Sequence, residues 1–256
     1  ACPECQSKIV WHRNIPVISW LFLRGRAKCC SFKIPHRYLL VEAFTGLVFS
    51  FLFVRIAISD DYAYGFCACI FALILISVIV IDAETMMIPD RFSMGGALVG
   101  FVLSISFPSI HSIYGAVSLS RWEVGVESMN GILIGSASLY WFGALAGRAL
   151  GKEALGEGDV KLLGCIGAFC GWEGAIFIIF AGATLGSIVL LPVLVIHSFR
   201  KQSNSGEVET SVGWGREVPF GPFLSLAAML YFGGCNYWVE PRISSKIQQV
   251  LISITQ

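Results

Sequence analysis

Long apolar runs recur along the chain, and each ends at a proline, a glycine or a charged residue. Most are about 18 to 25 residues long, which is what an α-helix needs to cross the hydrocarbon core of a bilayer. The pattern therefore predicts an all-α fold, a polytopic helical integral membrane protein. We expect about seven spans, at residues 39–59, 63–81, 92–109, 129–150, 160–173, 174–198 and 219–238.

The composition supports this fold class. Of the 256 residues, 55% are hydrophobic and only 14% are charged, against about 25% charged residues in an ordinary soluble domain. So few charges cannot cover a water-facing surface, which excludes a soluble enzyme and a disordered chain. Glycines also recur four residues apart, as at Gly131 and Gly135, and in lipid this spacing lets helix backbones pack closely.

The first 38 residues differ from the rest, since they hold seven Lys or Arg residues and four of the nine cysteines. We predict three parts. Residues 1–38 form a basic, cysteine-containing cytoplasmic module, residues 39–238 form the transmembrane domain, and residues 239–256 form an interfacial tail.

The basic residues also predict the orientation, because cytoplasmic loops of membrane proteins carry an excess of Lys and Arg. With the first module in the cytoplasm and the spans alternating, fourteen of the eighteen basic residues fall on the inner side and three on the outer side, and Arg55 lies near an outer helix end. The loops that follow the second span and precede the fifth then face the cytoplasm.

Two aspartates are the strongest candidates for chemistry. Asp82 directly follows the apolar run of the second span, and Asp159 stands at the entrance to the fifth. The topology brings both to the same membrane face, where two carboxylates can act as the acid and base for peptide hydrolysis. We expect Asp159 to be a helix N-cap and the more readily ionised partner, because helix N-termini favour negative charge. Asp82, near a helix C-terminus, would be the more readily protonated one.

The spacing alone also fits a plain alternative, in which Asp82 belongs to a solvated loop and Asp159 only caps a helix. A nucleotide-binding role for Gly156-x-Gly158 is discarded. No strand precedes this motif, and Lys161 occupies the place of the third glycine of a dinucleotide fingerprint.

Six short motifs occur in order along nearly the whole chain, and together they resemble the type IV prepilin peptidases of the GxGD class of intramembrane aspartic proteases. The motifs are Cys2-Pro3-x-Cys5, Asn14-Ile15-Pro16-x-x-Ser19-Trp20-Leu21, Arg37-Tyr38-x-x-Val41-Glu42, Ile81-Asp82 with Ile88-Pro89-Asp90, Gly156-Glu157-Gly158-Asp159-Val160-Lys161-Leu162-Leu163, and Pro219-Phe220-Gly221-Pro222.

The resemblance implies that Asp82 and Asp159 are the catalytic aspartates, with Asp90, Gly156, Gly158 and Lys161 in supporting positions. The family's substrate is a type IV prepilin or a secretion-system pseudopilin. It is cut after the glycine of a short basic leader, at the cytoplasmic face of the bacterial inner membrane. Membrane lipid is the other expected partner, and no nucleic acid is expected.

The family also methylates the new amino terminus with S-adenosylmethionine. Gly25-Arg26 matches a short element that the family associates with this step. Glu42 and Arg37 could anchor the donor site, or they could only pair with each other at the membrane interface. A basic loop attracted to acidic lipid headgroups is the alternative interpretation of Gly25-Arg26.

Cysteines supply a candidate zinc site. Many relatives have two Cys-x-x-Cys pairs, a spacing suited to four thiolates around zinc. Here the second pair is altered, because Ala27 stands where the resemblance expects a cysteine. A site of Cys2, Cys5, Cys29 and Cys30, a site of three thiolates with His12 or His36, and a metal-free loop with reduced thiols all remain open.

The sequence also bears on two other functional classes. A transporter or channel would carry acids near mid-span, and here the acids cluster at the predicted helix ends, which disfavours transport. A non-catalytic scaffold of a pilus or secretion assembly is the alternative that we retain. The family's usual first span, ahead of the cysteine module, has no counterpart in this sequence, so we expect the chain to be a fragment that lacks it.

Overall fold

The computed structural model describes residues 2, 4–10, 15–30, 32–111, 120–151, 155–203 and 219–235, so the predicted tail at 239–256 lies outside it. The chain divides into two compact units, Ala1–Asp60 and Asp61–Gln256. Every regular element among the described residues is a helix. Extended backbone there pairs only in an isolated antiparallel bridge between Arg26 and Lys33. The predicted all-α fold class is confirmed.

The first unit contains a short helix, α1 (Ile18–Phe22), a closed loop and the long helix α2 (His36–Ser59). Gly25 ends the turn after α1 with a φ of +68°, a left-handed conformation that glycine adopts at low cost. The loop closes through two backbone hydrogen bonds, from Ala27 N–H to the Phe32 carbonyl (2.9 Å) and from Ile34 N–H to the Gly25 carbonyl (2.8 Å). The cysteine module and α2 thus belong to one compact unit.

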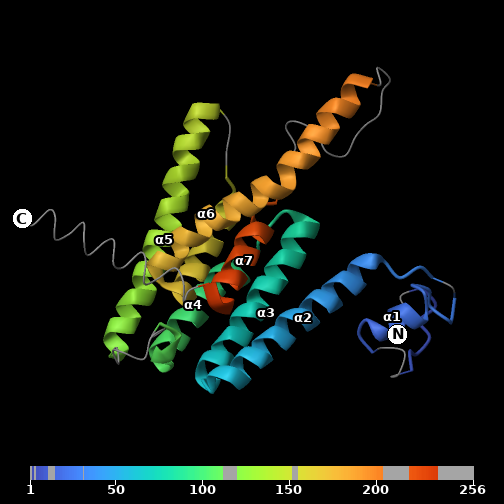
Figure 1. Cartoon of the computed structure of the whole chain (residues 1–256), viewed down its shortest axis with the longest axis horizontal. Helices are drawn as coiled ribbons and strands as arrows, with labels where there is room; N and C mark the ends of the chain where they lie inside the picture. Colours follow the sequence, from blue (N-terminus) through green and yellow to red (C-terminus); the bar gives the residue numbers. More distant parts are fainter. Residues whose placement is uncertain are drawn as a thin grey trace, which may run out of the picture. The chain divides into compact units, whose positions relative to one another are not determined.

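The second unit is a helical bundle. It contains α3 (Tyr62–Thr85), α4 (Asp90–Ser106), the short 3₁₀ turn η2 (Pro108–Ile110), α5 (Arg121–Leu150), α6 (Glu157–Ser203), α7 (Gly221–Leu230) and the π-helical turn η3 (Tyr231–Cys235). Helix α6 packs against α4, α5 and α7, and α7 also packs against α3 (Figure 1). The core of this unit therefore forms around α6, where Leu162, Leu163 and Ile166 are fully buried.

Four of the described helices are long and apolar enough to cross a membrane, namely His36–Ser59, Tyr62–Thr85, Arg121–Ala149 and Glu157–Pro192. All seven predicted spans fall on helices, but α4 has only 17 residues and α7 only 10. The predicted spans at 160–173 and 174–198 both lie in α6. The chain is thus a polytopic helical membrane protein, although the described residues do not supply seven full-length helices.

Helix α6 is interrupted at Gly171, whose φ of 69° and ψ of 179° are not helical. The Ala168 carbonyl, one turn earlier, accepts hydrogen bonds from the hydroxyls of Ser104 on α4 (3.1 Å) and Ser128 on α5 (2.9 Å). Backbone groups inside a membrane protein need such partners, because lipid offers none. Neighbouring helices therefore stabilise the break and hold the first half of α6, which carries Asp159.

Glycines allow α5 and α6 to approach closely, as the four-residue spacing predicts. A Cβ added at Gly131 would overlap the Gly167 backbone, and one added at Gly135 would lie 3.1 Å from the Leu163 carbonyl oxygen. Gly151 does not share this role. It ends α5 with a left-handed φ of 67°, and an added Cβ there would meet nothing within 4 Å.

Replacing Gly131 by alanine is expected to destabilise the fold by about 2 kcal/mol, because the two backbones would have to separate. The midpoint of thermal unfolding in detergent measures this loss. Gly164→Ala on α6 is the matched control, since its added Cβ makes only ordinary contacts of 3.7 Å and more. Equal midpoints for the two variants would contradict the close approach.

Candidate active site

Asp82 lies in the last turn of α3, as predicted. Its backbone carbonyl accepts a hydrogen bond of 2.9 Å from Met86 N–H, and Met86 ends the helix with a left-handed φ of 53°. The side chain is only 5% exposed, and Oδ2 makes no well-aligned hydrogen bond with the described residues. A buried carboxylate with so few hydrogen bonds is costly.

Asp159 lies in the first turn of α6, but its predicted role as N-cap is wrong. The helix begins at Glu157, so Asp159 is its third residue, and the Asp159 N–H donates to the Gly156 carbonyl at 3.2 Å. The first turn still favours a negative charge through the helix dipole. Asp159 also lies close enough to Asp82 for the charges of the two carboxyl groups to act on each other. Which of them ionises more readily stays a prediction.

Ile88, in the link between α3 and α4, brings three segments together beside the aspartates. A Cβ added at Gly158 would lie 3.3 Å from Ile88 Cβ, and one at Gly221 would lie 3.1 Å from Ile88 Cδ1. The same added atom at Gly221 would lie 2.6 Å from Asp82 Oδ2. The starts of α6 and α7 therefore pack closely around Ile88 because both carry glycine.

Gly156 has no comparable steric requirement. The nearest atom to an added Cβ there is Asp159 Oδ2, at 3.7 Å, which is an ordinary contact. Of the two glycines expected to support the site, only Gly158 needs to lack a side chain for packing.

Asp90 and Lys161 form an ion pair with Lys161 Nζ 2.8 Å from Asp90 Oδ1. The pair connects the first residue of α4 to the first turns of α6. The side chains are 62% and 36% exposed, respectively, and exposed ion pairs contribute little stability. The two predicted supporting residues thus bind each other, and their ion pair joins the start of α4 to the start of α6.

Lys161→Ala and Asp90→Asn are therefore each expected to slow substrate cleavage by less than about tenfold. The reason is that an exposed ion pair contributes only about 1 kcal/mol or less of stabilising free energy. Initial rates on a protein substrate measure this, and Lys161→Arg, which keeps the charge, should stay near the wild-type rate. A loss as large as that expected at Asp82 or Asp159 would assign Asp90 or Lys161 to the chemical step.

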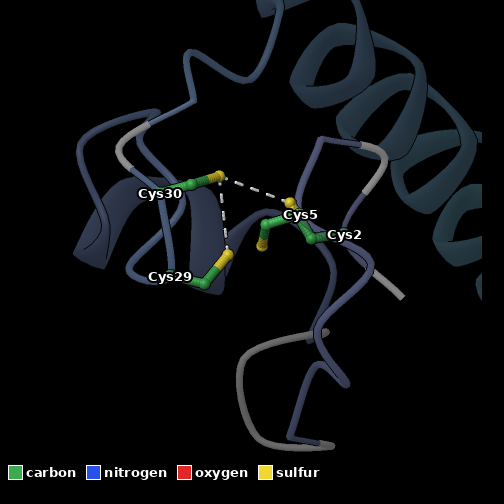
Figure 2. A group of neighbouring side chains, drawn as sticks. All are labelled: Cys2, Cys5, Cys29 and Cys30. Atoms are coloured by element: carbon green, nitrogen blue, oxygen red, sulfur yellow. Dashed lines mark hydrogen bonds between the residues drawn. The ribbon is translucent and has the colours of Figure 1, made fainter.

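The four cysteines of the first unit lie together, and their thiols point toward one another (Figure 2). All four sulfur atoms lie within 4.8 Å of one another. Cys30 Sγ is 3.6 Å from Cys2 Sγ and 3.7 Å from Cys29 Sγ. Zinc bound tetrahedrally by thiolates at about 2.3 Å holds its sulfurs about 3.8 Å apart, so these residues fit the metal.

The closed loop after Gly25 brings adjacent Cys29 and Cys30 into this cluster, which suits the four-thiolate alternative. Hydrogen bonding to Ser7, through its hydroxyl and then its backbone, lowers the pKa of the Cys5 thiol to about 6, and metal ligation requires thiolates. His36 is not in the described cluster and instead lies against Trp20 with ring centroids 5.2 Å apart. His12 lies outside the described residues.

The first unit contains a cavity of about 490 Å³, which involves two of the three residues expected to serve methyl transfer. Glu42 lines the cavity, and its Oε2 accepts a hydrogen bond of 2.7 Å from Val17 N–H. Gly25 lies behind the wall, where an added Cβ would be 2.8 Å from Trp20 Cζ2. Arg26 is not among the lining residues.

The sequence did not identify Trp20 and Tyr38 as residues that line the cavity, nor Ile88 and Gly221 as residues that pack beside Asp82. All four stand within or beside the six motifs, so their positions were available in the sequence. Their proximity to the cavity or to Asp82 depends on contacts between distant segments, which no motif specifies.

The fold and the site define a membrane protein with two aspartates at one end of a helical bundle and a cluster of four cysteines in a separate compact unit. Comparison with known families agrees with both parts. Residues 1–56 match the Bacterial Peptidase A24 N-terminal domain, and residues 69–191 match the Type IV leader peptidase family.

Similar curated proteins carry the name Prepilin leader peptidase/N-methyltransferase. The protein from Dichelobacter nodosus is 34% identical over 239 residues, which is 90% of this chain and 69% of the relative. The protein from Aeromonas hydrophila is 30% identical, and the match covers 93% of this chain and 73% of the relative. The protein from Pectobacterium carotovorum subsp. carotovorum is 32% identical, and the match covers 90% of this chain and 72% of the relative. No solved structure matches significantly. The chain belongs to the type IV leader peptidase family.

Proposed function

We propose that this chain removes the leader of a type IV prepilin or related pseudopilin with Asp82 and Asp159 as its catalytic pair, and then methylates the new amino terminus. The relatives' name supports both activities, prepilin cleavage and N-methylation. The observation that supports the assignment of residues is the proximity of these two carboxyl groups, from the end of α3 and the start of α6, where the charge of Asp82 acts on Asp159.

In the proposed reaction, one aspartate is ionised and the other is protonated. The ionised carboxylate takes a proton from water as the water oxygen attacks the scissile carbonyl carbon. The protonated carboxyl group gives its proton to the carbonyl oxygen, which forms a neutral tetrahedral intermediate. This intermediate collapses when a proton moves to the leaving nitrogen, and the C–N bond breaks. Two carboxyl groups sharing one proton can perform both roles.

The site is proposed to face the cytoplasm. The protein is a multi-pass inner-membrane protein, and its basic residues follow the distribution expected with the first unit inside. Asp82 and Asp159 both lie close to the ends of helices that could cross the bilayer. A pilin with an apolar helix in the membrane and a basic leader at its inner surface would present the leader at this level.

S-adenosylmethionine is proposed as the methyl donor, which supplies an electrophilic methyl group to the new amine. Zinc is proposed at Cys2, Cys5, Cys29 and Cys30, where the sulfur separations fit a tetrahedral ion. With no position left for a water ligand among four thiolates, such a metal would hold the loops of the first unit together rather than act on the substrate.

The test uses the purified full chain in liposomes with a prepilin and with a pseudopilin, with and without S-adenosylmethionine. Mass spectrometry of the product should show loss of the leader in both conditions and one added methyl group only with the donor. Metal analysis of the same sample should find one zinc per chain. An intact leader on both substrates, with a folded protein, would overturn the peptidase proposal.

A further inference from the structure

The cavity of the first unit combines flat apolar walls with charges of both signs. Aromatic rings come from Trp20, Phe32 and Tyr38, and charged groups come from Lys8, Arg37 and Glu42. Its volume of about 490 Å³ lies within the range of about 300 to 1,000 Å³ that small-molecule sites occupy. Nothing described above gives this cavity a role in peptide cleavage, since both aspartates belong to the second unit.

We infer that this cavity is the binding site for S-adenosylmethionine, with Trp20 and Tyr38 contacting its apolar and cationic parts and Glu42 binding its hydroxyl or ammonium groups. This inference rests on the proposed methyltransferase function and locates its donor site.

The donor's chemistry matches the lining group by group. Its adenine ring needs a flat apolar surface, and its sulfonium is a cation that aromatic faces attract. The ribose hydroxyls and the ammonium group need an acceptor, which the Glu42 carboxylate supplies. The donor's carboxylate needs a cation, which Lys8 and Arg37 supply.

Trp20 is held in place before any ligand arrives. Its indole Nε1–H donates to the Ile34 carbonyl at 3.3 Å, and the ring lies against Gly25 on one edge and His36 on another. Fixing a ring in advance reduces the ordering that binding requires. The wall of the cavity that Trp20 forms is therefore rigid.

Gly25 gains a physical role from this arrangement. Any side chain at position 25 would strain a left-handed backbone and also push the Trp20 ring, which lies 2.8 Å from an added Cβ. Gly25 is thus a positioning residue for the wall of the cavity. Arg26, which is not among the lining residues, is not needed for the donor contacts described here.

Glu42 connects the cavity to the start of α1. One carboxylate oxygen accepts from Val17 N–H at 2.7 Å, and this charge-assisted bond fixes the carboxylate at the cavity wall. Glu42→Gln keeps the size and an acceptor oxygen but removes the charge, so it tests the electrostatic part of binding with little change in shape.

The experiment measures binding of S-adenosylhomocysteine and of sinefungin, a donor analogue that carries an amine in place of the sulfonium, to the full chain in detergent by calorimetry. Tyr38→Ala and Glu42→Gln are each expected to weaken binding by about tenfold, as loss of one aromatic or charge-assisted contact does. Phe22→Ala and Glu4→Gln are the matched controls. Both residues are exposed in the same unit and neither lines the cavity, so both variants should bind as the wild type does.

Leader cleavage, measured on the same samples, should stay within twofold of wild type for all four variants, because none of them changes a residue of the unit that holds the two aspartates and surface substitutions outside a site have small effects. Wild-type affinity in both Tyr38→Ala and Glu42→Gln would overturn the site. The proposed function would stand in that case if the wild type still methylates its product with S-adenosylmethionine. Failure of the wild type to methylate at all would instead refute the function.

A second measurement does not depend on how the variants fold. Ultraviolet labelling of the wild type with S-adenosylmethionine radioactive in its methyl group, followed by peptide mapping, should place the label between residues 15 and 42. Label found only beyond residue 60 would overturn the inference.

Discussion

Asp82→Asn and Asp159→Asn are each expected to lower the rate of prepilin cleavage by at least about a thousandfold, the scale on which a positioned acid or base contributes. Asparagine keeps the size of the side chain but can neither take a proton from water nor give one to the carbonyl oxygen. The two losses should be similar in size, because the proposed reaction needs one group of each kind. Initial rates in liposomes at equal protein concentration measure the effect.

Asp60→Asn is the matched control for these variants. Asp60 is exposed and ends α2 with a left-handed φ of 52°, which asparagine also tolerates. Its cleavage rate should equal that of the wild type. If Asp82→Asn retained a tenth or more of the wild-type rate, a catalytic role for Asp82 would be ruled out, and the same limit applies to Asp159.

Gly221→Ala is expected to reduce cleavage by about a hundredfold, the cost of displacing a reacting group by roughly 1 Å. The added methyl carbon would lie 2.6 Å from Asp82 Oδ2 and 3.1 Å from Ile88 Cδ1, so either α7 or the Asp82 carboxyl group must move. The effect should fall on the turnover rate more than on substrate affinity, because the clash is at the carboxyl group itself. Steady-state kinetics in liposomes separates the two.

Gly95→Ala on α4 is the control for Gly221→Ala, since an added Cβ there meets nothing within 4 Å. Both variants should accumulate in the membrane to the wild-type level, and Gly95→Ala should cleave at the wild-type rate. A normal turnover rate in Gly221→Ala would contradict the close contact between α7 and Asp82.

The positions of the helices follow from the apolar pattern, because every span must hide its backbone from lipid. The start of α5 was missed by eight residues, although a signal for it exists. Ser120 and Glu123 form a capping box, with each side chain accepting from the other residue's backbone N–H. This Ser-x-x-Glu spacing is readable in sequence, but it lies in a polar stretch that hydrophobicity alone assigns to a loop.

A boundary between two predicted spans falls at residues 173 and 174, close to the break in α6, but the sequence did not identify Gly171, because glycine fits both a tight helix contact and a left-handed turn. Gly167 makes the contact, and Gly171, four residues later in the same spacing pattern, makes the break. The difference arises from hydroxyls on α4 and α5 that satisfy the Ala168 carbonyl. Such a choice depends on partners that are distant in sequence.

The candidate site was predictable as far as topology determines it. Alternating spans placed Asp82 and Asp159 on one membrane face, and both lie at one end of the bundle around Ile88. Asp159 was misplaced as a cap because Glu157, two residues earlier, already begins the helix. The cysteine cluster was left open because adjacent Cys29 and Cys30 are a poor zinc spacing, whereas the closed loop directs both thiols to Cys2 and Cys5.

The most direct test of the central claim, that one chain brings both aspartates to a single cleavage site, is a mixing experiment. Wild type, Asp82→Asn, Asp159→Asn and an equimolar mixture of the two variants are reconstituted with a prepilin, and the product is identified by mass spectrometry. We expect cleavage by the wild type alone. Cleavage by either single variant, or by the mixture, would show that the site does not need both aspartates in the same chain.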